Sequence, residues 1–322
     1  MKKQLLIAAV AATMTSAAFA DISLSGDAKV NYTNVDSATD TLNRNEIAHD
    51  INMHLVGKNG ASSVNVDFSN VSTAANSDVV ATAFEVENAY VTSAIGDVSV
   101  KMGQWNNTSD SYMSNATNST IGTGKVTLST TLGGVKIAYS DNEDNAQNVV
   151  VSGSVSGVSI SHKMQTDTGA TEDYTDTKVS GSVAGVNAMY RTKEIDGANN
   201  DLTAFELSTE FNGVTVTYAD VDVEGTGTGL AMDSFLGTYS GLSQASGFGA
   251  KMAIAGNTVQ VKSISTNSNA SATGTDDKYT KFYVTRQLAS GATFEATYTD
   301  KDAAAGATSD SETLDLELAV KF

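Results

Sequence analysis

The 322-residue chain contains no cysteine, no proline and one tryptophan. Without cysteine, neither disulfide bonds nor thiolate metal sites can stabilise the fold. No Pro-rich, Ser-rich or charge-rich linker divides the chain, which indicates one continuous domain. After the first twenty residues no apolar run approaches the roughly 18 residues that a transmembrane helix needs. The pattern therefore excludes a helical membrane protein.

Basic side chains are also scarce. The chain has 19 Lys and Arg against 37 Asp and Glu, a net charge of −18, and no basic patch. So negative a chain argues against nucleic acid and anionic lipid head groups as partners, and favours cations as counter-charge. No cofactor or structural metal is predicted, and calcium in the acidic loops is the one ion that the pattern leaves open.

The N-terminus has the features of an export signal. A basic start at Lys2 and Lys3 precedes an apolar run from Leu5, and small residues follow at Ala18 and Ala20. We interpret residues 1–20 as a cleaved secretory signal and residues 21–322 as a single mature domain.

The two ends of this domain alternate apolar and polar residues. In the last segment, "TLDLELAVKF", Leu314, Leu316, Leu318, Val320 and Phe322 share one face. The first segment, "ISLSGDAKVNY", alternates in the same way from Ile22. Either segment alone would be an unpaired strand edge, a hazard for aggregation. We therefore expect the first and last strands to pair and close a ring.

Between the ends, one unit recurs: two alternating runs joined by a short glycine-containing turn. Glycine and Asn-Gly supply the positive φ that tight hairpin turns require. Eight such turns alternate with longer polar connections, of which 105–123 is the longest early one. Eight hairpins plus a strand at each end predict an all-β, antiparallel up-and-down β-barrel of 18 strands, with turns at one rim and loops at the other.

Soluble β-sandwiches and β-solenoids also alternate, so the character of the two faces decides. The apolar faces consist mostly of Val, Ile, Leu and Ala, whereas the opposite faces carry acids and bases, which fits a lipid-facing outside and a wet inside. Tyrosine recurs where strands approach the long loops, at Tyr32, Tyr139, Tyr218 and Tyr298. We interpret these four as an aromatic girdle at a membrane boundary.

The start "ISLSGDAKVNY", the end "LDLELAVKF", the glycine hairpins and the signal peptide together resemble the Gram-negative general diffusion porins of the alphaproteobacterial type. The resemblance implies a trimeric, 16-stranded transmembrane barrel in the outer membrane, with a third loop folded inward at about 105–123. It also implies that Phe322 is a signal for outer-membrane assembly. The hairpin count gives 18 strands and the family 16, and both numbers stay open here.

Candidate site residues follow from the loop and from strand parity. In the loop, Asp110 is the only charge and is predicted to bias passing ions, with Lys29, Lys101, Glu85 and Glu87 also assigned to the constriction. The predicted positive wall comprises Lys125, Lys136, Lys163, Lys178, Arg191 and Lys193. The predicted negative wall comprises Asp27, Asp50, Asp67, Glu206, Glu210, Glu295, Asp315 and Glu317. Lys262 is a further inward base, and the side of the strand "KYTKFYVTRQLA" is left unassigned.

Along the chain, inward charges from Lys125 to Lys193 are basic, and those from Glu206 round to Glu87 are mostly acidic. Neighbouring strands in a barrel are consecutive, so we expect a field across the pore that orients polar solutes.

Enzymatic alternatives have little support. His49 and His54 are five residues apart and would face opposite sides of a strand, and no nucleophile-elbow or P-loop motif occurs. The favoured function is a general diffusion porin with mild cation preference, passing small hydrophilic solutes. Its expected partners are outer-membrane lipid, lipopolysaccharide and two further copies in a homotrimer.

Two alternatives remain. A substrate-selective channel, for sugars or another small nutrient, would line its path with aromatic residues, and few inward aromatics are expected beyond Trp105 and Tyr112. A structural or adhesive barrel would have a plugged lumen and no conductance.

Overall fold

The computed structural model describes residues 21–38, 43–75, 85–105, 114–115, 124–142, 146–167, 173–196, 201–223, 230–231, 235–237, 243–267, 276–303 and 310–322. Regular structure within these ranges consists of β-strands. Their residues include no helix that is long and apolar enough to cross a membrane. The predicted signal peptide and Asp110 lie outside the described residues.

The long strands form one 18-stranded sheet. They are β1 (Asp21–Ser37), β2 (Arg44–Asn59), β3 (Ser62–Ala75), β4 (Glu85–Ile95), β5 (Val98–Gln104), β7 (Gly124–Leu132), β8 (Val135–Asn142), β9 (Ala146–Val155), β10 (Val158–Asp167), β11 (Tyr174–Val183), β12 (Val186–Ile195), β13 (Leu202–Phe211), β14 (Val214–Val223), β16 (Gln244–Ile254), β17 (Asn257–Asn267), β18 (Asp277–Gln287), β19 (Ala292–Asp302) and β20 (Ser311–Lys321).

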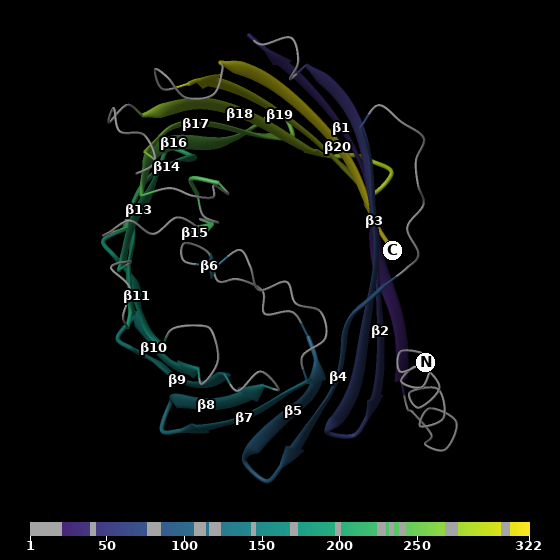
Figure 1. Cartoon of the computed structure of the whole chain (residues 1–322), viewed down its shortest axis with the longest axis vertical. Helices are drawn as coiled ribbons and strands as arrows, with labels where there is room; N and C mark the ends of the chain where they lie inside the picture. The colour runs from purple at the N-terminus through teal and green to yellow at the C-terminus, as the bar shows by residue number, and fades with distance from the viewer. Residues whose placement is uncertain are drawn as a thin grey trace.

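Each strand pairs antiparallel with its neighbours in chain order, and β1 pairs with both β2 and β20 (Figure 1). The sheet is therefore a closed barrel, and the predicted pairing of the first and last strands is confirmed. The count of 18 from the hairpins is also confirmed, and the 16 strands implied by the porin resemblance are wrong. The family number fails because the "VSGSVSGVSISH" and "SGSVAGVNAMYR" hairpins are both full members of the ring.

The tight turns have the backbone geometry that their residues predict. Ser156 and Gly157 both have positive φ, 51° and 82°, and so do Asn212 and Gly213, 51° and 78°. Two successive positive φ values define the primed turn whose twist matches that of the flanking strands.

The closing seam depends on one glycine. Gly26 and Phe322 exchange backbone hydrogen bonds of 2.8 and 2.9 Å, which extends the β1–β20 ladder to Phe322. A Cβ at Gly26 would lie 2.7 Å from Cζ of Phe322 and 2.3 Å from the Asn52 carbonyl oxygen. Gly26 therefore interrupts the apolar face of β1 so that the phenylalanine ring can lie across it.

The outer face carries the apolar set. Exposed large apolar side chains alternate along the strands, among them Leu24 on β1, Phe248 on β16 and Leu318 on β20. A face with this composition would be unstable in water but suits contact with hydrocarbon. The residues that alternate with them face the interior.

The four predicted girdle tyrosines lie on this outer face, in phase with its apolar residues. The Tyr218 hydroxyl donates to Asp220 Oδ2 at 3.4 Å, so the ring and the acid of the Tyr-x-Asp pattern are joined. Tyr190 on β12 and His162 on β10 face outward four residues after the start of their strands, as Tyr139 does on β8 and Tyr218 on β14. Sequence reasoning missed both.

Candidate solute pathway through the barrel

The structure places the predicted wall charges on the inner face of the barrel, out of phase with the exposed apolar residues. The bases there form what we call the basic arc, on β5 to β12: Lys101, Lys125, Lys136, Lys163, Lys178, Arg191 and Lys193. The acids on β19, β20 and β1 to β4 form the acidic arc: Glu295, Asp315, Glu317, Asp27, Asp50, Asp67, Glu85 and Glu87. Lys29 lies within the acidic arc, and Glu206 and Glu210 lie on β13, beside the basic arc.

Short polar contacts hold the acidic arc in place. Asp67 accepts from Asn88 at 2.8 Å and lies 2.9 Å from Nδ1 of His54. Thr33 donates to Asp315 at 2.5 Å, and Thr285 donates to Glu295 at 3.1 Å. These partners lie on neighbouring strands of the same wall, so they fix the orientation of the carboxylates that face the lumen.

A β-bulge places Glu87 on the inner face. The register between β3 and β4 shifts at Asp67 and Phe68, which leaves Glu87 without a partner across the ladder. Its carboxylate accepts a 2.5 Å hydrogen bond from Ser69. Strict alternation from Asn88 would turn Glu87 outward, so the bulge is what brings it to the same side as Glu85.

On the basic arc, two lysines fix the start of the segment that follows β5. The ammonium of Lys101 lies 3.8 Å from the centroid of the Tyr90 ring and 4.2 Å from that of Trp105. Lys125 donates to the Trp105 carbonyl oxygen at 2.7 Å. Tyr90 and Trp105 meet edge to face at 6.0 Å. Cation–π contact and a charged hydrogen bond thus hold Trp105 against the wall.

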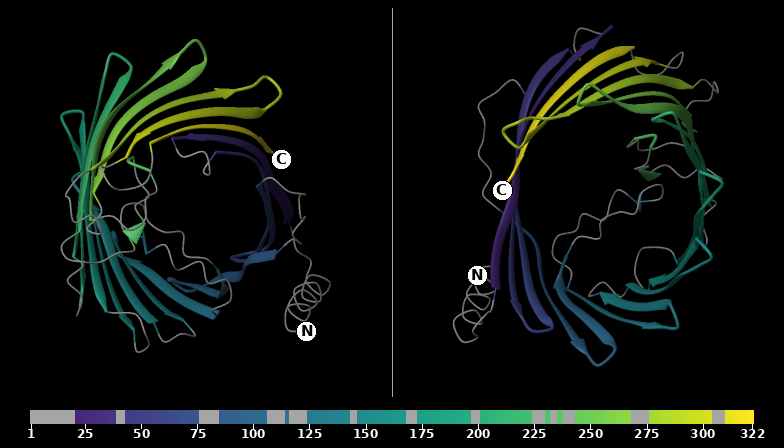
Figure 2. Two further views of the ribbon diagram at one scale, coloured as in Figure 1. Left: turned by 45° about the horizontal axis from the view of Figure 1, so that its top comes forward. Right: turned by 180° about the vertical axis from the view of Figure 1, so that it is seen from behind.

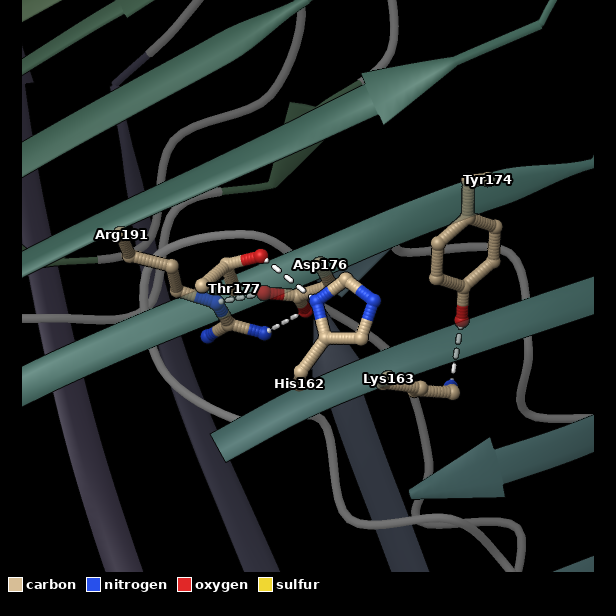
Figure 3. Close-up of polar contacts among 6 residues, drawn as sticks. All are labelled: His162, Lys163, Tyr174, Asp176, Thr177 and Arg191. Carbon is tan, nitrogen blue, oxygen red and sulfur yellow. Dashed lines mark hydrogen bonds and ion pairs between the residues drawn. The ribbon is translucent and has the colours of Figure 1, made fainter. Parts of the chain in front are cut away.

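A second group, the paired cluster, consists of Lys163, Tyr174, Asp176, Arg191 and Lys193 on β10 to β12 (Figure 3). Arg191 binds Asp176 with both Nε, at 2.8 Å, and Nη2. Lys163 donates to the Tyr174 hydroxyl, and the Lys193 ammonium lies 4.2 Å from the Tyr174 ring centroid. Arg191, Lys193 and Asp176 are all buried. Each cation in the cluster therefore has a partner on the wall itself.

Asp176 corrects the prediction that inward charges from Lys125 to Lys193 are all basic. It lies on the same face of β11 as Lys178, two residues away, so parity could have found it. His162, drawn beside the cluster in Figure 3, belongs to the opposite, outer face and bonds to Thr177 at 2.8 Å.

The stretch from Glu206 to Glu87 is likewise less acidic than predicted. Lys251, Lys262 and Lys281 face inward on β16, β17 and β18, out of phase with exposed Met252, Val261 and Phe282. They form a second basic strip between Glu206 and the acidic arc. The strand left unassigned, β18, therefore turns Phe282 and Val284 outward and Lys281 inward.

The expectation of few inward aromatics is wrong. Tyr90, Tyr174, Tyr279 and Tyr283 all face the lumen, in phase with the inward lysines of their own or neighbouring strands. Lys262 lies 4.7 Å from the Tyr283 ring centroid. Sequence parity missed Tyr279 and Tyr283 because Arg286 shares the face of Phe282 and obscured which side of β18 is apolar.

Two segments from the loop rim lie inside the ring. The short strands β6 (Ser114–Asn115) and β15 (Leu230–Ala231) pair with each other within the barrel outline (Figures 1 and 2). β6 belongs to the segment 105–123 that is expected to fold inward, most of which lies outside the described residues, and sequence reasoning missed the inward position of β15, between β14 and β16.

The second segment is docked on the wall by Phe235 and Leu236. Leu236 is fully buried against an apolar patch on the inner wall of β13, β14, β16 and β17, composed of Leu202, Ala204, Ala219, Val221, Val223, Ala245 and Ile264. The Lys262 ammonium lies 5.0 Å from the Phe235 ring centroid. Near the loop rim the inward residues of β14 are thus apolar, and its outward residues, Asp220 and Asp222, are acidic.

Two glycines form the socket under this docked pair. A Cβ at Gly247 would lie 3.0 Å from Cδ2 of Leu236, and one at Gly249 would lie 2.6 Å from Cζ of Phe235. The run "SGFGA" alternates glycine inward with Phe248 outward, so the wall is hollow where the segment rests.

The arrangement is suited to guiding solutes. The described residues contain no group of three or more His, Asp or Glu side chains that could hold a metal ion. The acidic loops lie largely outside those residues, so calcium binding there stays a prediction. A solute in the barrel would meet acidic and basic side chains on different strands, the faces of inward aromatic rings, and the two inward segments β6 and β15.

These features define a closed 18-stranded barrel of the kind found in bacterial outer-membrane proteins. Among solved structures, the chain is similar to the outer membrane protein OpdK of Pseudomonas aeruginosa, with a TM-score of 0.73 and 9% identity over 94% of this chain and 99% of that one. It is similar to OccK5 (OpdH) of the same organism, with a TM-score of 0.70 and 9% identity over 95% and 99%, and to its OpdL, with 0.69 and 10% over 94% and 99%. No family model and no curated protein matches the sequence. At these identities the likeness concerns the fold.

Proposed function

We propose that this protein is a Gram-negative outer-membrane channel that passes small hydrophilic solutes passively and selects among them. The observation that supports selection is the wall itself: lysines held beside inward aromatic rings, with the acidic arc on other strands. A general diffusion pore needs only width and a wet surface, whereas paired charges and ring faces present specific contacts to a solute.

The two inward segments support the same proposal. β6 and β15 come from connections far apart in the chain, and their pairing places both within the barrel. A solute must pass beside them, close to the charged wall. The loop's Asp110 is proposed to act at this level together with Lys29, Lys101, Glu85 and Glu87.

The outer membrane is the proposed location because the apolar belt, the girdle and the fold all suit a lipid bilayer. Export by the signal at residues 1–20, the assembly role of Phe322, the homotrimer and lipopolysaccharide contact remain predictions.

Single-channel recording on the refolded protein in planar bilayers tests the proposal. We expect stable conductance in KCl, and lasting current interruptions with some small nutrients but not with others of the same size. Size-ordered passage without interruptions would support a general diffusion porin instead. Absence of conductance would support a plugged structural barrel.

The mild cation preference expected from the acid excess is tested in the same recordings. A KCl gradient gives a reversal potential, whose sign reports which ion crosses more easily. A reversal potential set by chloride would show that the basic arc and the second basic strip outweigh the acidic arc and loops.

A further inference from the structure

A hollow on the inner wall of β8 to β11 adjoins the paired cluster on the side of the turn rim, with Lys178 directly across the ladder from Arg191. It has a volume of about 460 Å³ and is lined by Lys136, Lys178 and the hydroxyls of Ser152, Ser154, Ser159 and Ser161, with Ser180 at its edge. We call these five serines the serine floor.

The strand registers order these groups in rows. Lys136 lies opposite Ser152, Ser152 opposite Ser161, and Ser161 opposite Lys178, on four successive strands. One row nearer the turns, Ser154 lies opposite Ser159, and Ser159 opposite Ser180. Adjacent strands are about 4.8 Å apart, so the two lysines bracket the floor at a separation of about 14 Å between their backbones.

The two lysines differ in their surroundings from the cations of the paired cluster. Among the residues that the structure describes, neither Lys136 nor Lys178 makes an ion pair, whereas the cluster's Arg191 binds Asp176. An ammonium that is already paired contributes little to binding a solute. Unpaired ammoniums beside hydroxyls retain their donors for one.

The neighbouring hollow limits what can bind. It shares Ser180 and contains Glu206, whose carboxylate repels anions on the β13 side. The anionic end of a solute is therefore favoured towards β8 to β11, over Lys136 and Lys178. Serine hydroxyls both donate and accept, which matches the hydroxyl groups of a sugar.

We propose that this hollow is a binding site for a small polyhydroxylated anion, a sugar acid or sugar phosphate of monosaccharide size. Lys136 and Lys178 bind the carboxylate or phosphate, and the serine floor bonds to the hydroxyls. The site names a solute class for the proposed channel and rests on that function, yet binding can be measured without conductance.

The experiment uses the full refolded chain with gluconate and glucose 6-phosphate as probes. The dissociation constant is measured by calorimetry in detergent and, independently, from interruptions of single-channel current. Glucose tests the need for charge, and hexanoate tests the need for hydroxyls. Lys136→Gln/Lys178→Gln should weaken binding of both probes by about tenfold or more, because two charged hydrogen bonds are lost.

Lys251→Gln is the matched control, since it removes an inward lysine from β16 and leaves the hollow intact. Ser152→Ala/Ser161→Ala should reduce the preference for gluconate over hexanoate while the lysines remain. Equal dissociation constants in wild type and the double lysine variant would overturn the site, and so would equal losses in Lys251→Gln. Binding without any conductance would preserve the site and refute the channel.

Discussion

Two parts of the inner wall lie side by side on the barrel and are built in opposite ways. The paired cluster on β10 to β12 is charged and buried, and its cations are matched by Asp176 and Tyr174. The apolar patch on β13 to β17 is uncharged and buried, and Leu236 covers it. The difference shows that the inner wall of a barrel need not be uniform. Its side chains can be buried either by pairing their own charges or by a docked segment of chain.

The two constructions have different consequences. Bidentate Arg191 binds its acid from the neighbouring strand, so the paired cluster joins β11 to β12 and should affect the stability of the barrel. The apolar patch holds an inward segment, so it should affect the width of the pore while the ring stays intact. The expected roles are thus divided: the paired cluster stabilises the barrel, and the apolar patch sets the width of the pore.

The largest effect is expected from Asp176→Ala. It leaves Arg191 buried without its carboxylate, and breaking a buried ion pair costs about 3–5 kcal/mol. The free energy of unfolding, measured by urea titration in detergent micelles, should fall by that amount. In the double variant Asp176→Leu/Arg191→Met most of the loss should be recovered, because the buried guanidinium is removed together with its carboxylate. An Asp176→Ala barrel as stable as the wild type would mean that the pair contributes nothing.

Leu236→Ala is expected to weaken docking of the inward segment by about 2–3 kcal/mol, since a fully buried leucine side chain is removed. Single-channel conductance should rise and its noise increase, with little change in the urea midpoint of the barrel. Leu314→Ala, on the exposed outer face of β20, is the matched control and should leave the conductance unchanged. A loss of barrel stability with constant conductance would contradict the division.

Gly247→Ala approaches the same contact from the wall. The new methyl group would lie 3.0 Å from Leu236 and 2.6 Å from the Ser263 carbonyl oxygen. Overpacking of this kind costs about 1–3 kcal/mol. Conductance should change in the same direction as in Leu236→Ala. Gly181→Ala, whose closest added contact is 3.1 Å, with the Gly157 carbonyl oxygen, controls for strand glycine loss away from the patch.

The smallest effect is expected from Lys101→Met. The substitution keeps the aliphatic stem but removes the charge between Tyr90 and Trp105, a contact worth about 0.5–2 kcal/mol. Tryptophan fluorescence reports the result directly, because Trp105 is the single tryptophan of the chain. Its emission should shift to longer wavelength and be quenched more readily by iodide. An unchanged spectrum would show that Trp105 is held without Lys101.

Sequence patterns predicted most of the frame. Alternation and glycine turns gave the strand number, the turn rim and the β1–β20 closure, because each depends on local chemistry with a period of two. Parity also placed the predicted lysines and acids on one face. Glu87 was placed correctly on the inner face, but for the wrong reason: a β-bulge turns it inward, and no sequence pattern indicates that bulge.

The errors have two physical causes. First, one conspicuous charge on a strand can hide another: Asp176 shares the inner face of β11 with Lys178, and Arg286 on the outer face of β18 masks the inward Lys281. Second, the polarity of the two faces reverses at the loop end of β14. There the inward Val221 packs against a docked segment, while the acidic Asp220 and Asp222 face outward. Periodicity alone shows which residues share a face of a strand, but not whether that face meets lipid, water or another segment of the chain.

The sequence by itself determined that this chain closes into an 18-stranded ring with an oily outside and a charged inside, because turn chemistry and alternation act between neighbours along the chain. Only the tertiary structure decided which charges are matched, as with Arg191 and Asp176, and which wall is covered by Leu236. Those outcomes depend on register between strands and on contact between segments far apart in sequence, and no local pattern encodes either.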